Sequence, residues 1–243
     1  MCEENGLTEN IIVFKYKFSF KNRKEKIITI KLNALTLDHI PSEKKNSCPS
    51  WTKLSFYQCE NCPLDVNIHE YCPIAVNFID LFDYFTSLES YNETDVKIES
   101  TERTYYQKTT VQRGLGSLIG IYMVTSGCPR MEVLKPMVRF HLPFASLQET
   151  VFRSVSTYLL GQYFSMKQGK SADFGLEKLK AFYLEIQQVN SGIVNRLRPV
   201  IAKDAFANAI ISLDAFAKGL PWSIEDELEN LKYLYSGYFK DAG

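Results

Sequence analysis

Apolar and polar side chains alternate along the first part of the chain. Between residues 11 and 20, apolar side chains occupy every second position, with lysine and serine between them. The alternation resumes over 27–32, after a polar turn at 21–24. Side chains two residues apart share one face of a strand, so the pattern predicts an antiparallel hairpin. Residues 95–111, rich in Thr, Tyr and Val, predict one further long or bent strand.

Apolar side chains recur at helical spacing through most of the remaining sequence. One helix is predicted to begin at Pro73, because proline suits the first helical position, where its missing N–H has no intrahelical partner. A buried helix is predicted over 115–124, closed by Gly127. Ser146 and Glu149 have the spacing of a capping box and predict another helix start.

Three more helices are predicted towards the C-terminus. Asp173 is expected to cap the first of them, which must bend or stop before Pro199. Apolar residues over 206–216 predict a second helix, with Gly219 as its stop. The last helix is expected to start at Ser223.

These elements predict an α+β fold. A small antiparallel sheet, made of the N-terminal hairpin and one later strand, is expected to pack against a mainly helical C-terminal half. No linker or internal repeat divides the sequence, so residues 1–243 are expected to form a single domain. Its β-rich front would cover residues 1–110, including a window of cysteines, and its helical back 111–243.

Charge and hydropathy narrow the classes of function. The chain has 28 Lys and Arg against 28 Asp and Glu, so the basic surplus of a typical nucleic-acid-binding protein is not found. The longest apolar run, 115–124, is too short to span a bilayer, and the acidic N-terminus does not have the composition of a secretory signal. We therefore expect a soluble, cytoplasmic protein without a nucleic-acid or membrane partner.

Cysteine spacing supplies the sharpest chemical hypothesis. Cys59 and Cys62 form a Cys-x-x-Cys pair, Cys72 follows ten residues later, and Cys128 lies further along. Proline follows four of the six cysteines, namely Cys48, Cys62, Cys72 and Cys128. In Cys72-Pro73 and Cys128-Pro129, the cysteine is expected to cap a helix, where free N–H groups and the helix dipole favour a thiolate. The sequence therefore predicts a metal centre held by Cys59, Cys62, Cys72 and Cys128.

The proline pattern favours an iron–sulfur cluster over zinc as the cofactor. Zinc sites usually combine two Cys-x-x-Cys pairs, often with glycine after the second cysteine, whereas this chain has one pair and Pro63 in that place. Cys-Pro recurs at iron–sulfur ligands. Zinc is the alternative metal, and buried free thiols are the alternative to any centre. His69 is a possible substitute ligand, and Cys48 is expected to be dispensable.

Residues 139–144, Arg-Phe-His-Leu-Pro-Phe, form a second unusual stretch. If it is extended, Arg139 and His141 share a face and can form a polar pocket with Glu149 and Arg153 of the following helix. The structural alternative is an ion pair between Arg139 and Glu149, with His141 bonded to a backbone carbonyl. We expect this structural alternative, because structural ion pairs outnumber catalytic ones.

The cysteine and arginine stretches also resemble a known family. The matching pattern is Trp51-Thr52-x-Leu54, Cys59-x-Asn61-Cys62-Pro63-Leu64, Cys72-Pro73-x-Ala75, Gly127-Cys128-Pro129 and Pro136-Met137-x-Arg139-Phe140-His141-Leu142-Pro143-Phe144. It resembles a bacterial family described only as a domain of unknown function, over roughly residues 50–165. The resemblance implies a bacterial source and a shared site without an assigned reaction. Cys48 lies outside the pattern, which favours Cys128 as the fourth ligand.

Three functional interpretations follow from the sequence. The first is a bacterial cytoplasmic protein with a cysteine-ligated metal centre, either structural or redox-sensing. The second is a metal-free adaptor whose helical half binds a protein partner. The third is an enzyme or small-molecule sensor that uses Arg139 and His141.

Overall fold

The N-terminal alternation forms the middle of an antiparallel sheet. The computed structural model describes residues 10–21, 24–41, 47–85, 88–201 and 204–240. Its strands are β1 (Ile11–Phe20), β2 (Glu25–Asn33), β3 (His39–Ile40), β4 (Glu93–Glu99) and β5 (Thr104–Thr110), in the order β3-β2-β1-β4-β5. The predicted hairpin is confirmed, and its register places Phe14 opposite Ile30 and Tyr16 opposite Ile28. All four side chains are buried on one face of the sheet.

Residues 95–111 form two strands and a helix start, so the prediction of one long strand is wrong. β4 and β5 pair as a hairpin in which Glu99 lies opposite Thr104. The turn between them is closed by the hydroxyl of Ser100, which accepts from the backbone N–H of Arg103. Because a serine hydroxyl can accept a hydrogen bond from a nearby backbone N–H and so close a turn, the chain reverses where the sequence pattern suggested a bend.

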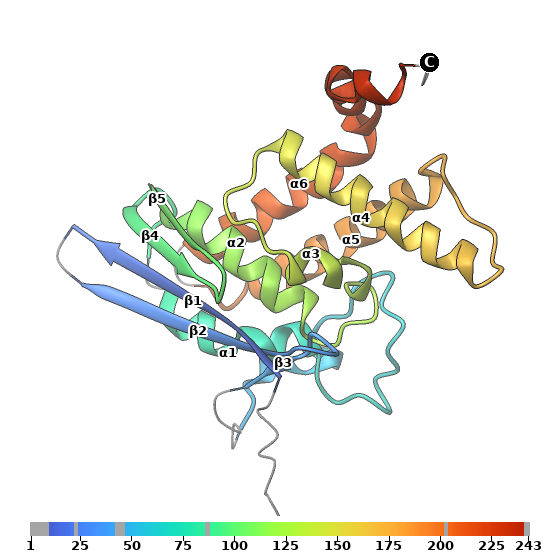
Figure 1. Ribbon diagram of the computed structural model, residues 1–243. Coiled ribbons are helices and arrows are strands. Elements are labelled where there is room, and N and C mark those ends of the chain that lie inside the picture. Colours follow the sequence, from blue (N-terminus) through green and yellow to red (C-terminus); the bar gives the residue numbers. More distant parts are fainter. Residues whose placement is uncertain (1–9, 22–23, 42–46, 86–87, 202–203, 241–243) are drawn as a thin grey trace, which may run out of the picture.

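Helices make up most of the rest of the chain (Figure 1), which confirms the α+β class. They are α1 (Pro73–Phe85), α2 (Val111–Val124), α3 (Lys135–Arg139), α4 (Leu147–Lys167), α5 (Glu177–Leu197) and α6 (Asp204–Leu231). Four short 3-10 helices cover Ser50–Thr52, Leu54–Phe56, Glu132–Leu134 and Lys232–Tyr238. The predicted capping box is present at the start of α4, where the side chains of Ser146 and Glu149 bond each other's backbone N–H groups.

The helices near the C-terminus differ from prediction in two places. Leu176 is the N-cap of α5, in a left-handed conformation, but the Asp173 carboxylate still accepts from the backbone N–H of Lys178. Gly219 does not end a helix, because α6 continues through it and through Pro221. Buried residues on both sides keep α6 helical across this weak point, since core packing outweighs local propensity. They include Ala217, Leu220 and Ile224.

Helix α2 separates the sheet from the C-terminal helices. α1 and α2 cover the buried face of the sheet, where Phe18 packs edge-on against Phe85 of α1. Gly114 of α2 allows a close approach, because a Cβ there would lie 2.7 Å from the Phe18 ring. On the other side of α2, α6 packs against it and α5 packs along α6 (Figure 1). α2 therefore has one face towards the sheet and another towards the helical half.

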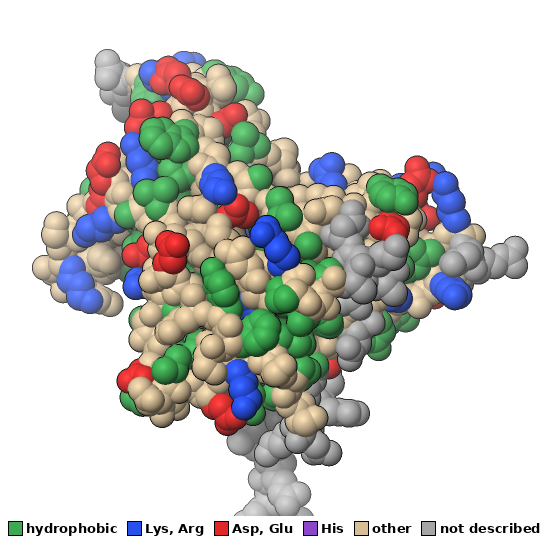
Figure 2. Space-filling model, turned by 180° about the vertical axis from the view of Figure 1, so that it is seen from behind, with side chains coloured by type: hydrophobic (Ala, Val, Ile, Leu, Met, Phe, Trp, Pro, Cys, Tyr) green, Lys and Arg blue, Asp and Glu red, His purple; other side chains and the backbone are tan. Residues whose placement is uncertain are grey.

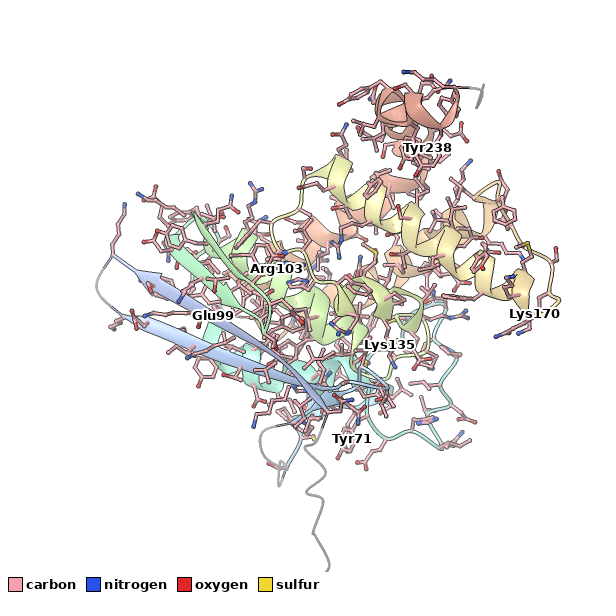
Figure 3. The ribbon with its side chains drawn as sticks, in the orientation of Figure 1. Tyr71, Glu99, Arg103, Lys135, Lys170 and Tyr238 are labelled. Carbon is pink, nitrogen blue, oxygen red and sulfur yellow. The ribbon has the colours of Figure 1, made fainter. Side chains whose placement is uncertain are left out.

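The surface mixes charged and apolar side chains. Figure 2 shows Lys and Arg side chains interspersed with Asp and Glu, and apolar side chains gathered between them. At the far C-terminal end, Tyr238 is 85% exposed on a segment that projects from the body (Figure 3). Within the described ranges, no helix is long and apolar enough to cross a membrane.

Candidate functional site

The structure gathers the four predicted cysteines around one small cavity. Cys59, Cys62, Cys72 and Cys128 all line it, and its volume is about 20 Å³. All four thiols are free. Cys48 is also a free thiol, but it does not line this cavity.

The predicted metal centre is nevertheless wrong. Among the residues that the structure describes, no group of three or more His, Cys, Asp or Glu side chains is placed to hold a metal ion. The Cys59 thiol lies against α5, within 4.0 Å of the Val189 carbonyl oxygen and close to Gly192. The Cys-x-x-Cys spacing fixes how far two sulfurs can reach but not where they point, and here packing on α5 sets the direction of one of them.

Burial also works against the predicted thiolates. Burial raises the pKa of Cys72, which precedes the first residue of α1. The Arg196 charge and the backbone N–H groups of Ala75 and Ile74 lower it by less, so the net shift is upward. Burial raises the pKa of Cys59 to about 12 and that of Cys128 to about 11. Cys128-Pro129 forms a turn closed by the N–H of Met131, not the predicted helix start.

A buried arginine holds the loop that carries Cys59. Arg196 of α5 is 1% exposed, and its guanidinium donates to backbone carbonyls of the preceding segment. The acceptors are the carbonyl oxygens of Trp51, at 2.7 Å, Lys53, at 2.6 Å, Leu54 and Tyr57. A chain segment without regular strands offers few backbone donors to such carbonyls, and the arginine supplies five donors in one plane. Sequence reasoning missed this residue.

The structure brings together two of the four residues predicted to form a polar pocket around residues 139–144. His141 and Arg153 line a large cavity, whereas Arg139 and Glu149 do not. α3 extends to Arg139, so Arg139 and His141 do not share an extended segment, and Arg139 lies over the exposed Phe140 ring. The Glu149 carboxylate accepts from Ser146, so the expected Arg139–Glu149 ion pair is also wrong.

His141 bonds two hydroxyl groups rather than the expected backbone carbonyl. Its Nε2 lies 2.6 Å from the Tyr16 hydroxyl oxygen and 3.2 Å from Ser117 Oγ, and these two oxygens are 2.9 Å apart. Burial, together with the nearby Arg153 guanidinium, lowers the pKa of His141 to about 3. The imidazole is therefore neutral at physiological pH, and its Nε2 shares a short hydrogen bond with the Tyr16 hydroxyl.

This arrangement does not favour nucleophilic catalysis by Ser117. A general base needs a pKa near the operating pH, and a pKa of about 3 leaves His141 with little affinity for a proton. Nε2 is also occupied by Tyr16, whose own pKa is raised by burial. The three side chains instead form a neutral hydrogen-bonded group, and two of them, Ser117 and His141, line the cavity.

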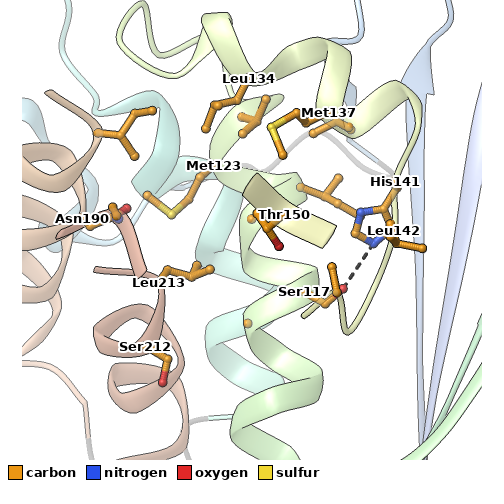
Figure 4. A pocket seen from close by; sticks show the side chains of 18 of the residues that line it. Ser117, Met123, Leu134, Met137, His141, Leu142, Thr150, Asn190, Ser212 and Leu213 are labelled. Atoms are coloured by element: carbon orange, nitrogen blue, oxygen red, sulfur yellow. Dashed lines mark hydrogen bonds between the residues drawn. The ribbon is translucent and has the colours of Figure 1, made fainter. Parts of the chain in front are cut away.

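The cavity itself has a volume of about 590 Å³. α2, the segment 131–145, α4, α5 and α6 all contribute to its walls. Figure 4 shows His141 and Ser117 on one side of it and Asn190 and Ser212 on the other. Most of the lining between them is apolar: Ile121, Met123, Val124, Met131, Leu134, Met137, Val138, Leu142, Phe144, Ala145, Ile186, Leu213 and Ala217.

Two glycines of α2 open the cavity further. Gly116 and Gly120, one helical turn apart, both line it, and no heavy atom lies within 4 Å of the position that a Cβ would take at either residue. Gly114, on the opposite face, contacts the sheet instead. Each glycine inside a helix costs about 0.5–1 kcal/mol relative to alanine. The helix therefore gives up stability at two positions where the space beside it is empty.

A comparison with models of protein families shows to which family the chain belongs. A family model described as "Domain of unknown function (DUF6901)" matches residues 14–236. The chain belongs to this family. The match extends on both sides of the stretch in which the sequence pattern suggested a resemblance. Comparisons with curated proteins and with solved structures found no match.

Sequence reasoning on this DUF6901 member missed most of the cavity. Tyr16 was identified only as part of a strand, and Ser117 only as part of a buried helix. The spacing of Gly116 and Gly120 was the available signal, because two glycines four residues apart in a predicted helix indicate a face with little side-chain volume.

Proposed function

We propose that the protein binds a small, largely apolar molecule in the cavity between α2 and the C-terminal helices. Binding sites for small molecules are typically concave, mainly apolar, with a few polar groups, and have volumes of about 300–1,000 Å³. The cavity has these properties, because its lining is mainly apolar with some polar groups and its volume is about 590 Å³. Met123, Met131 and Met137 add flexible apolar side chains that can adapt to a ligand.

The pair Gly116 and Gly120 is the observation that carries the proposal. A helix face that meets the protein interior is normally filled by side chains, because close packing stabilises the fold. Here two residues without side chains lie beside open space on that face. A bound molecule would occupy this space and supply the missing apolar contacts.

Filling the cavity from α2 tests the proposal. Gly120→Leu adds an apolar side chain where nothing lies within 4 Å of the Cβ position, so the variant should fold with an equal or higher melting temperature. The neutral fluorophore N-phenyl-1-naphthylamine should bind the wild-type protein saturably, with increased emission. Its affinity should fall by about tenfold or more in Gly120→Leu, a loss of at least about 1.4 kcal/mol.

Gly219→Leu is the matched control. Gly219 is also helical and has no heavy atom within 4 Å of its Cβ position, but it does not line the cavity. This variant should bind the fluorophore like the wild type. The proposal is wrong if the wild-type protein does not bind the fluorophore, or if folded Gly120→Leu binds it with unchanged affinity.

A further inference from the structure

The walls of the cavity have an unbalanced charge. Arg113 and Arg153 both line it, and no Asp or Glu is among the described residues that do so. His141 does not add to this charge, since it is neutral at physiological pH. The cavity is thus apolar in its body and cationic at two points of its wall.

Arg153 is the better placed of the two cations. Arg113 is exposed, whereas Arg153 is half-buried on α4. One terminal nitrogen of Arg153, Nη2, donates to the carbonyl oxygens of Met137 and Phe140, at 2.8 Å each. These two bonds fix the guanidinium beside the segment that leads into His141.

The remaining donors of Arg153 have no protein acceptor. Within the described part of the chain, its guanidinium makes no ion pair, and Nε and Nη1 make no hydrogen bond. Nor are they among the buried polar atoms that lack a partner, so they are accessible from the cavity or from solvent. Glu149 influences the pKa of Arg153, but its carboxylate is engaged by Ser146.

We propose that the ligand is a carboxylic acid with an apolar body, such as a medium-chain fatty acid, and that Arg153 pairs with its carboxylate. This inference rests on the proposed function and adds the chemical class of the ligand. The free N–H donors on Nε and Nη1 can each form a charge-assisted hydrogen bond to a carboxylate oxygen, and the guanidinium supplies the opposite charge. Partial burial makes the ion pair stronger than one at the surface, because less water screens it.

His141 supplies a second polar contact on the same side of the cavity. In the tautomer in which Nε2 accepts from Tyr16, the proton of the neutral ring lies on Nδ1. Among the described residues Nδ1 has no hydrogen-bond partner, and it is not a buried atom without a partner. In this tautomer Nδ1–H can donate to the acid, and the alkyl body extends over the methionines and the glycine face of α2.

Comparing the binding of an acid and an alcohol of the same chain length tests this inference separately from the proposed function. Sodium decanoate and 1-decanol share a ten-carbon chain, and each is titrated against bound N-phenyl-1-naphthylamine at neutral pH. The wild-type protein should bind decanoate about tenfold more tightly than decanol, or better, as a charge-assisted contact allows. Equal affinities would overturn the carboxylate assignment while leaving apolar binding intact. Failure of all three probes to bind would overturn the proposed function itself.

Substitutions of Arg113 and Arg153 test which of them contacts the carboxylate. Arg153→Gln should weaken decanoate binding by about tenfold and leave decanol and the fluorophore unchanged, whereas Arg153→Lys should keep part of the preference. Arg139→Gln, at an exposed cation outside the cavity, should bind like the wild type. If Arg113→Gln removes the preference and Arg153→Gln does not, the assignment to Arg153 is wrong. Should Arg153→Gln not fold, Arg153→Lys decides the matter: a reduced or lost preference for the acid supports the assignment, and an unchanged preference overturns it.

Discussion

Arg196 shows how one side chain can hold an irregular segment in the core. The segment 50–57 contains two short 3-10 helices, which satisfy few of its carbonyl oxygens. Arg196 bonds four carbonyls of this segment and contacts no carboxylate among the described residues. A buried charge is tolerated only when it is well solvated by dipoles, and here the backbone of one loop provides them.

Replacing Arg196 should therefore be among the most destabilising substitutions in the chain. Arg196→Met keeps the aliphatic volume but leaves buried carbonyls without donors, each at a cost of about 1–3 kcal/mol. We expect the free energy of unfolding, measured by urea denaturation, to fall by about 3–5 kcal/mol. Arg198→Met, at an exposed position two residues on, should change it by less than about 0.5 kcal/mol. A loss below about 1 kcal/mol for Arg196→Met would contradict this account.

Individual residues also show what could not be predicted from the sequence. The unusual stretch 139–144 pointed to the right region, and His141 and Arg153 do line one cavity. Arg139 was misplaced because α3 ends at that residue and turns it away. The partners of His141 come from β1 and α2, more than 100 residues and 24 residues away in sequence, respectively. A local pattern holds no information on such contacts.

The boundaries of elements were predicted correctly where local interactions determine them. Pro73 marks the start of α1, because it has no N–H that would lack a partner there, and the Ser146–Glu149 capping box marks the start of α4, because its side chains accept from free backbone N–H groups. Gly219 failed as a stop signal, because α6 continues past it with buried residues on both sides. The direction of the four cysteine side chains likewise depends on packing between elements, which spacing does not encode.

The contact between α5 and the loop that carries Cys59 gives a testable prediction about how two elements pack. Gly192 of α5 has no room for a side chain, because a Cβ there would lie 2.4 Å from Cys59 Sγ and 3.2 Å from Cys59 Cα. Gly192→Ala should lower the free energy of unfolding by about 1–3 kcal/mol, although alanine favours the helix.

The double variant Gly192→Ala with Cys59→Ala separates this clash from other effects. Removing the sulfur should restore part of the lost stability, but not all of it, since Cys59 Cβ would still lie 3.0 Å from the new methyl group. Gly219→Ala, at an exposed helical position with open space, should raise stability by up to about 1 kcal/mol. The free energy of unfolding of each variant is measured by chemical denaturation. Equal changes in Gly192→Ala and Gly219→Ala would contradict the clash.

On the scale of the whole molecule, α2 is the wall shared by the sheet and the cavity. Gly114 faces Phe18 of the sheet, whereas Gly116 and Gly120 face the cavity. Tyr16, Ser117 and His141 tie together β1, α2 and the segment after α3. The hydrogen-bonded group beside the proposed ligand is thus also a junction of the fold. An additional role of the helical half in binding a protein partner stays a prediction.

This junction predicts how stability depends on pH. Folding holds the pKa of His141 near 3, whereas the unfolded chain has an ordinary histidine pKa of about 6.5. The neutral ring therefore stabilises the fold fully above about pH 6.5, and that stability is lost as the pH falls towards 3, because only the unfolded chain takes up the proton. The slope is about 1.4 kcal/mol per pH unit, so about 2 kcal/mol should be lost between pH 6.5 and 5.

Urea denaturation at several pH values between 5 and 7.5 measures this loss. The window lies above the usual titration range of the carboxylates, so their contribution stays small there. His141→Gln should be less stable at neutral pH, because Tyr16 and Ser117 lose their imidazole partner, and it should show a much flatter dependence on pH in this window. His69→Gln, at an exposed histidine, should keep the wild-type slope. If His141→Gln retains that slope, the neutral imidazole does not couple the stability of the molecule to pH.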